Sequence, residues 1–315
     1  MHWLWGRLGG CMRGSMAGCL APALIMAGCA PAQEDSGEQL RVILIPADGG
    51  TEDGTRADYQ PIFDAIAKTT GLSFDIRVGQ SYAMVVEALC NNKADIAFVG
   101  PITYLQARER GCADLLAVGV ENDQSIYHAG LFARSDSPIQ TVAELKGHAV
   151  AFGDVNSTSS FLYPVAMVID VGIDPVRDLS AVRMTGSHAD SLAALAHGQV
   201  DAAALSFDSF EKAANEGAVD PATIRVIGKS APIPYPPLVM NNRLDDGMKR
   251  TLRAAFASVH EPPGITPDMI RGYGGKQVDR YDSTITPAQF DSVGLVMAQV
   301  DEPMKAALIR KAAGQ

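Results

Sequence analysis

The chain has 315 residues, of which 47% are hydrophobic and 20% are charged, and its 26 Lys and Arg against 36 Asp and Glu give a net charge of −10. This composition excludes a disordered chain, and the length predicts two domains. An acidic chain with 6% aromatic residues and no basic cluster is a poor match for nucleic acid, whose phosphates are bound by Lys and Arg.

The first 28 residues have the pattern of a targeting segment. They contain Arg7 and Arg13 and no acidic residue, and the apolar run over 17–28 follows. That run is shorter than the ~20 residues that a membrane-spanning helix needs, so residues 1–28 are predicted to be a signal peptide.

The predicted signal peptide ends before Cys29, which follows Ala27 and Gly28. Two small residues before a cysteine resemble the bacterial lipobox, and this resemblance implies cleavage before Cys29 and attachment of lipid to it. The polar residues 29–39 would then form a tether. If the host is Gram-negative, Ala30 after the cysteine favours sorting to the outer membrane. An ordinary secretory signal is the alternative.

The first half of the mature chain alternates short apolar strands with amphipathic helices. Strands are predicted over 41–46, 72–78, 94–99 and 115–120. Helices are predicted over 59–70, 81–90 and 102–110. Such alternation indicates an α/β architecture with a largely parallel sheet.

The same pattern then starts again and predicts a second α/β lobe. Its strands are predicted over 130–133, 149–152, 181–184, 202–205 and 225–227, and its helices over 142–146, 161–171, 191–197 and 210–216. The segment 231–237 holds four prolines, which predicts an extended crossover outside any sheet. The rest is predicted to be mostly helical, over 246–258, 267–271 and 287–300.

Two α/β lobes joined by crossover segments around a ligand cleft fit this order. The expected first lobe combines 40–131 with 239–315, and the expected second lobe is 132–238. The C-terminal helices are therefore expected to return to the first lobe.

Cys90 and Cys112 are the cysteines that remain once residues 1–28 are removed and Cys29 carries lipid. In an oxidising compartment, one such pair is typical of a structural disulfide, here within the first lobe. A thiol pair that captures a soft ligand such as arsenite is the alternative. No histidine lies near either cysteine in the sequence, so no metal site is predicted.

Four consecutive hydroxyl residues, 157–160, link a predicted strand to a predicted helix. Ser and Thr are natural helix caps, and the start of a helix offers free backbone N–H groups and the positive end of its dipole. Together they predict an anion cradle. Pro164 indicates that the helix begins just after residues 157–160, because a proline is tolerated near the start of a helix and not deep inside it. A serine-rich cap without a ligand is the alternative.

The segment FGDVNSTSSFLYP, residues 152–164, resembles the F-G-x-x-D-P-N-S-T-S-G-F/Y-L-x-P segment of periplasmic phosphonate-binding proteins of ABC importers. Further resemblances in unbroken order extend over most of 41–245. They comprise DYQP at 58–61, YA at 82–83, NKADIA at 92–97, SDSPI at 135–139, GSH at 186–188 and QVDA at 199–202.

This resemblance implies a type II periplasmic-binding-protein fold that closes two lobes around a tetrahedral oxyanion. Carried over by position, it predicts that Ser157, Thr158, Ser159, Tyr82 and His188 bind the ligand, with Asp208 near the position of a family acid. Ser160, next to the hydroxyl run, and Tyr127, which precedes the crossover segment and could face the cleft, complete the predicted ligand-binding set. The hydroxyl residues would bind the anionic oxygens, and Asp208 would face the far end of the ligand.

The sequence departs from the family at a few positions. Ser160 stands where the family usually has Gly, and Val155 stands where it has Pro. The residues 99–101 offer no polar side chain, and the crossover 231–237 is apolar. A larger or partly apolar ligand is therefore an alternative to a phosphonate.

The sequence thus predicts a periplasmic, lipid-anchored and monomeric solute-binding protein that delivers a phosphonate, phosphite or phosphate to an ABC importer. No cofactor, metal, nucleic acid or catalysis is expected. One alternative keeps the fold but serves a sensor with an arsenite-type oxyanion, or a non-ABC transporter with a lipid-like solute. Another is an envelope hydrolase that uses Ser157 or Ser159 with His188.

Overall fold

The computed structural model describes residues 39–47 and 52–315. The predicted signal peptide 1–28, the lipidation site Cys29 and all but the last residue of the tether 29–39 lie outside the described residues. Within the two described ranges, no helix is both long and apolar enough to cross a membrane.

The first sheet has the strand order β13-β4-β12-β3-β1-β2. Its strands are β1 (Gln39–Leu44), β2 (Ser73–Val78), β3 (Ile96–Phe98), β4 (Ala113–Val120), β12 (Pro237–Asn241) and β13 (Arg280–Asp282). Strands β2, β1, β3 and β4 run in one direction, while β12 and β13 run against their neighbours. The sheet is largely parallel, as predicted.

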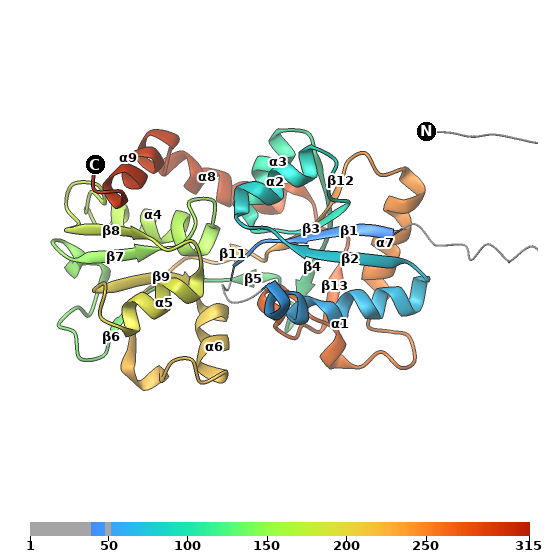
Figure 1. Cartoon of the computed structure of the whole chain (residues 1–315), viewed down its shortest axis with the longest axis horizontal. Coiled ribbons are helices and arrows are strands. Elements are labelled where there is room, and N and C mark those ends of the chain that lie inside the picture. Colours follow the sequence, from blue (N-terminus) through green and yellow to red (C-terminus); the bar gives the residue numbers. More distant parts are fainter. Residues whose placement is uncertain (1–38, 48–51) are drawn as a thin grey trace, which may run out of the picture. The chain divides into compact units, whose positions relative to one another are not determined.

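The second sheet has the strand order β10-β6-β9-β7-β8 and is separate from the first (Figure 1). Its strands are β6 (Ala129–Arg134), β7 (Ala149–Phe152), β8 (Ala181–Met184), β9 (Ala202–Ser206) and β10 (Ile224–Lys229). Strands β10, β9, β7 and β8 run in one direction, and β6 runs in the opposite direction. The chain crosses to the second sheet before β6 and returns to the first sheet before β12. In each case the first strand after the crossover runs antiparallel to its neighbours.

A two-stranded ribbon joins the crossover segments. It pairs β5 (Ile126–Tyr127) with β11 (Ile233–Pro234) in antiparallel fashion. The expectation that the prolines of 231–237 stay outside any sheet is wrong at two positions. Pro234 belongs to the ribbon, and Pro237 is the first residue of β12, a central strand. Proline is tolerated at both, because the start of a strand and a short ribbon require fewer N–H donors.

Helices cover both faces of each sheet (Figure 1). Around the first sheet lie α1 (Glu52–Thr70), α2 (Tyr82–Cys90), α3 (Pro101–Glu109) and α7 (Asp246–Ser258). Around the second lie α4 (Tyr163–Asp170), α5 (His188–Ala196) and α6 (Phe207–Asn215). Sequence periodicity placed all seven, but α1 begins seven residues before the predicted 59, where Arg56 pairs with Glu52 and Asp53.

The last two helices, α8 (Asp291–Gln299) and α9 (Glu302–Ala312), do not lie with the first sheet alone. Helix α8 contacts both α3 and α4, and α9 packs against β8 of the second sheet. The expected return of all of 239–315 to the first lobe therefore does not describe α9. Leu308 of α9 is buried against other apolar residues. The periodicity of the sequence does not indicate against which of the two sheets such a helix packs.

Cys90 and Cys112 form a disulfide, as predicted, with their Cα atoms 4.9 Å apart. It joins the last residue of α2 to the segment after α3, and these two helices pack together. The two cysteines are therefore not free thiols in this structure, as capture of a soft ligand would require.

Replacing both Cys90 and Cys112 by Ser should lower the free energy of unfolding by about 3 kcal/mol, because the closed loop of 22 residues would no longer restrict the unfolded chain. Denaturant unfolding of the oxidised wild type and of the double variant measures this difference. Reduced wild type should match the variant. Equal stabilities of oxidised and reduced wild type would contradict the prediction.

Candidate functional site

The hydroxyl residues form the turn that begins α4, as the sequence predicts. The turn Asp154–Ser157 is closed by two bonds, from Ser157 N to the Asp154 carbonyl and from Asn156 N to the Asp154 carboxylate, both 2.8 Å. Ser157 then caps one π-helical turn, Thr158–Leu162, by accepting a bond from Ser160 N at 3.1 Å. All four hydroxyl residues are buried.

This turn is held by the starts of two helices that cover the other sheet. Thr158 Oγ1 accepts a bond of 3.0 Å from Ile102 N in the first turn of α3. The N-cap of that helix is Gly100, which has no side chain to do so, and Thr158 therefore supplies the cap from across the cleft. The backbone N–H of Tyr82, at the start of α2, lies near enough to Asp154 to lower the pKa of its carboxyl group.

Asn156 provides the third link across the cleft. Its side-chain oxygen accepts a bond of 2.8 Å from Gln106 Nε2, and its backbone carbonyl accepts one of 3.4 Å from Thr103 Oγ1. Asp154, Asn156 and Thr158 thus alternate along the turn and each contacts α2 or α3. Burial raises the pKa of Asp154, and the N–H groups of Asn156 and Tyr82 oppose that rise.

Tyr127 lies in the β5–β11 ribbon and reaches the same turn. Its side chain is buried, and Ser159 and Thr158 lie near enough to its hydroxyl to oppose the rise in pKa that burial causes. Burial raises the pKa of Tyr127 strongly, so the phenol keeps its proton at neutral pH. The structure therefore places Tyr127 near the hydroxyl run, and its contact with a ligand stays a prediction.

His188 is the first residue of α5 and is fully buried. Its backbone N–H donates to the Ala47 carbonyl, just after β1, at 2.9 Å. Its Nδ1 accepts a bond of 2.9 Å from Ser206 N, so a neutral ring carries its proton on Nε2. That Nε2 lies 3.2 Å from the Tyr273 hydroxyl. His188 is thus oriented by the second lobe and joined to the first.

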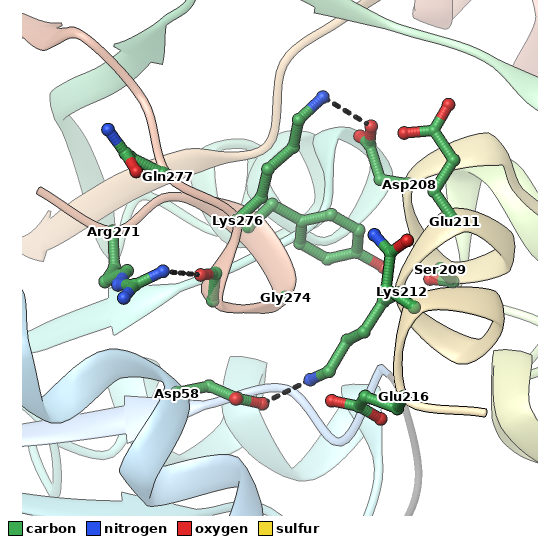
Figure 2. Close-up of a pocket in the computed structure, with 13 residues that line it drawn as sticks. Asp58, Asp208, Ser209, Glu211, Lys212, Glu216, Arg271, Gly274, Lys276 and Gln277 are labelled. Atoms are coloured by element: carbon green, nitrogen blue, oxygen red, sulfur yellow. Dashed lines mark hydrogen bonds and ion pairs between the residues drawn. The ribbon is translucent and has the colours of Figure 1, made fainter. Parts of the chain in front are cut away.

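Asp208, in the first turn of α6, lies beside a charged pocket of about 370 Å³ (Figure 2). Lys276 Nζ lies 3.1 Å from the Asp208 carboxylate and 2.8 Å from that of Glu121. Lys212 of α6 pairs with Asp58 of α1 on the opposite side of this pocket. The residues 157–160 do not line the pocket, but Asp208 interacts electrostatically with Tyr127.

Four residues of this region were missed by the sequence reasoning. Asp154 and Asn156 lie inside the segment that resembles the phosphonate binders, so their motif positions could have drawn attention to them. Tyr273 and Lys276 had no such signal, because they lie in a glycine-rich turn far along the chain. Among the described residues, no group of three or more His, Cys, Asp or Glu is placed to hold a metal ion.

Comparisons with known proteins agree with this architecture. Residues 50–275 match the family described as the periplasmic substrate-binding protein of phosphonate ABC transporters. The chain belongs to this family. It has the two-lobed type II periplasmic-binding-protein fold, and the family consists of periplasmic substrate-binding components of ABC transporters.

Two curated relatives and one solved structure illustrate the similarity. The chain is 29% identical to a phosphate-import protein of Mycolicibacterium smegmatis over 70% of this chain and 71% of that protein. It is 26% identical to a phosphonates-binding periplasmic protein of Escherichia coli over 68% of this chain and 64% of that protein. A binding protein of an ABC phosphonate transporter from Pseudomonas aeruginosa shares the fold at a TM-score of 0.74 and 22% identity, covering 88% and 96% of the two chains.

Gln106→Ala should shift the ligand-free protein toward separated lobes, because it removes the bond to Asn156. One side-chain bond is worth roughly 0.5–1.5 kcal/mol, so the ratio of closed to open molecules should fall about two- to tenfold. Energy transfer between dyes placed on the two lobes measures this ratio.

Gln60→Ala is the matched control, because Gln60 donates a bond of 2.7 Å to Asp64 within α1 alone. It should leave the ratio of closed to open molecules unchanged. Equal shifts in both variants would show that the Gln106 bond does not hold the lobes together.

Proposed function

We propose that this protein captures a small phosphorus oxyanion, such as phosphate, phosphite or an alkylphosphonate, and delivers it to an ABC importer. The observation that carries the proposal is the buried hydroxyl run at the start of α4, in a chain that belongs to the phosphonate-binding family. The ligand-binding roles of individual residues are part of the proposal.

The chemistry of the turn favours an oxyanion. Backbone N–H groups in the first turn of a helix have no intrahelical acceptor, and the helix dipole adds positive potential there. The oxygens of Ser157 and Thr158 already accept bonds from backbone N–H groups, so their own protons remain to be donated. These are neutral donors, which suit a ligand that brings its own negative charge.

Closure of the lobes is the proposed mechanism of capture. The turn that would bind the anion is also the turn that contacts α2 and α3, so ligand binding and lobe contact would reinforce each other. In this proposal, Tyr127 contributes to the cradle from the ribbon, and Tyr82 and His188 form the surrounding wall. The closed monomer is then recognised by the membrane subunits of the transporter.

A hydrolase is the less suitable function for these residues. A serine nucleophile needs a general base within hydrogen-bond reach, and His188 would have to fill that role. Its Nδ1 instead accepts the Ser206 backbone N–H, and its Nε2 faces Tyr273. We therefore propose a binding protein without catalytic residues, which needs no cofactor.

The membrane anchor is a separate part of the proposal and rests on sequence alone. We propose that residues 1–28 are a lipoprotein signal peptide and that Cys29 carries the lipid, with Ala30 directing the protein to the outer membrane of a Gram-negative host. The tether then places the two lobes on the periplasmic side of that membrane.

Thr158→Val should weaken binding of a phosphorus oxyanion about 10- to 100-fold, because a charge-assisted hydrogen bond contributes roughly 1.5–3 kcal/mol. Thr158→Ser keeps the hydroxyl and should stay close to wild type. Isothermal calorimetry with phosphate, phosphite and methylphosphonate measures these affinities.

A lipid extract is the comparison ligand in the same calorimetry. Heat from the lipid extract alone, with equal affinity in wild type and Thr158→Val, would overturn the oxyanion proposal in favour of an apolar solute. The two-lobed fold would be unaffected by that result.

Cys29→Ser should release the protein from membranes without changing ligand affinity, because the lipidation site precedes the folded lobes. Fractionation of cells followed by a high-salt wash tests this, with Cys11→Ser as the matched control that should remain membrane-bound. Retention of Cys29→Ser in the washed membranes would contradict lipidation at this residue.

A further inference from the structure

Asp208 places a negative charge near the proposed anion cradle. Its side chain is only 13% exposed, and its charge raises the pKa of the Tyr127 hydroxyl, in addition to the larger effect of burial. Tyr273 lines the same pocket as Asp208 and joins it to the proposed ligand wall. Its hydroxyl lies 3.2 Å from His188 Nε2, and its ring centroid lies 6.0 Å from that of Tyr127. A carboxylate so placed would repel an anionic ligand and attract a cationic substituent on it.

Lys276 supplies a cation at this carboxylate. Its Nζ lies 3.1 Å from Asp208 and 2.8 Å from Glu121, so one ammonium is shared between two carboxylates. Burial lowers the pKa of Lys276, but its interactions with Glu121 and Asp208 outweigh burial and raise it overall. Lys276 therefore carries a full positive charge at neutral pH.

The backbone turn before Lys276 fixes where its side chain begins. Gly274 and Gly275 adopt positive φ angles, and Gly272 N donates to the Lys276 carbonyl at 2.7 Å. A side chain at Gly275 would collide with Asp58 of α1, so the turn lies directly against that helix. Lys276 thus belongs to the first lobe, whereas Asp208 lies on α6 of the second, and their ion pair forms where the lobes meet (Figure 2).

We propose that Lys276 is a specificity-determining residue that selects oxyanions without a cationic substituent. The proposal rests on the function proposed above and names the class of ligand: phosphate, phosphite and simple alkylphosphonates rather than zwitterionic aminoalkylphosphonates. The reason is that the Lys276 ammonium already occupies the position beside Asp208 that a ligand ammonium would take when the lobes close. An aminoalkylphosphonate would have to displace it or remain without a carboxylate partner.

Ethylphosphonate and 2-aminoethylphosphonate are the suitable probes, because they differ only by one ammonium group. Wild type should bind ethylphosphonate more tightly. Lys276→Met removes the ammonium beside Asp208 and should shift the ratio of the two dissociation constants at least about tenfold toward 2-aminoethylphosphonate. Lys276→Arg keeps the charge and should restore the wild-type ratio. Calorimetry with each purified protein gives both constants.

Lys212→Met is the matched control, since Lys212 pairs with Asp58 across the same pocket. It should weaken both ligands alike and leave their ratio unchanged, because it affects lobe contact and not Asp208. An unchanged ratio in Lys276→Met, an equal change in Lys212→Met, or a wild-type preference for 2-aminoethylphosphonate would each overturn the role of Lys276. Failure of wild type to bind any phosphorus oxyanion would instead refute the underlying proposed function.

Discussion

The polar turn Asp154–Thr158 is the constraint on which the arrangement of this site depends, because its last two residues are buried and the three before them are half-buried. A buried backbone amide or hydroxyl without a partner costs about as much as a lost hydrogen bond, so the turn must find donors and acceptors. It finds them in α3, where the N–H of Ile102 needs an acceptor and where Thr103 and Gln106 donate to Asn156. The two lobes therefore satisfy each other's polar groups at the position proposed for the ligand.

The four hydroxyl residues 157–160 look equivalent in sequence, but each makes different contacts in the structure. The oxygens of Ser157 and Thr158 accept backbone N–H groups, one within the turn and one across the cleft. Ser159 lies near the Tyr127 hydroxyl, whereas Ser160 Oγ is buried without a hydrogen-bond partner among the described residues and faces Gly153. A side chain at Gly153 would collide with Ser160, so these two residues fit together only with glycine at 153.

Local signals in the sequence were enough to predict most of the fold and the centre of the candidate site. The ranges of β7, β8 and α7 agree with the predicted ones, and the turn before α4 and the Cys90–Cys112 bond were also predicted. Strand β13 and helix α9 were missed, because each packs against a strand far away in the sequence, β4 for β13 and β8 for α9. Lys276 was missed for the same reason, since its importance arises only from its distance to Asp208.

Charge explains why such a site would use neutral donors with one shared ammonium. The whole chain is acidic, so its long-range field disfavours anions, and short-range donors must overcome that field inside a closed cleft. A site formed by several basic side chains would bind anions of many different shapes with similar affinity. Directed N–H and O–H groups instead require a ligand of matching geometry, and Lys276 limits the repulsion from Asp208 and Glu121. Specificity then depends on closure, because only the contact between lobes brings that ammonium to Asp208.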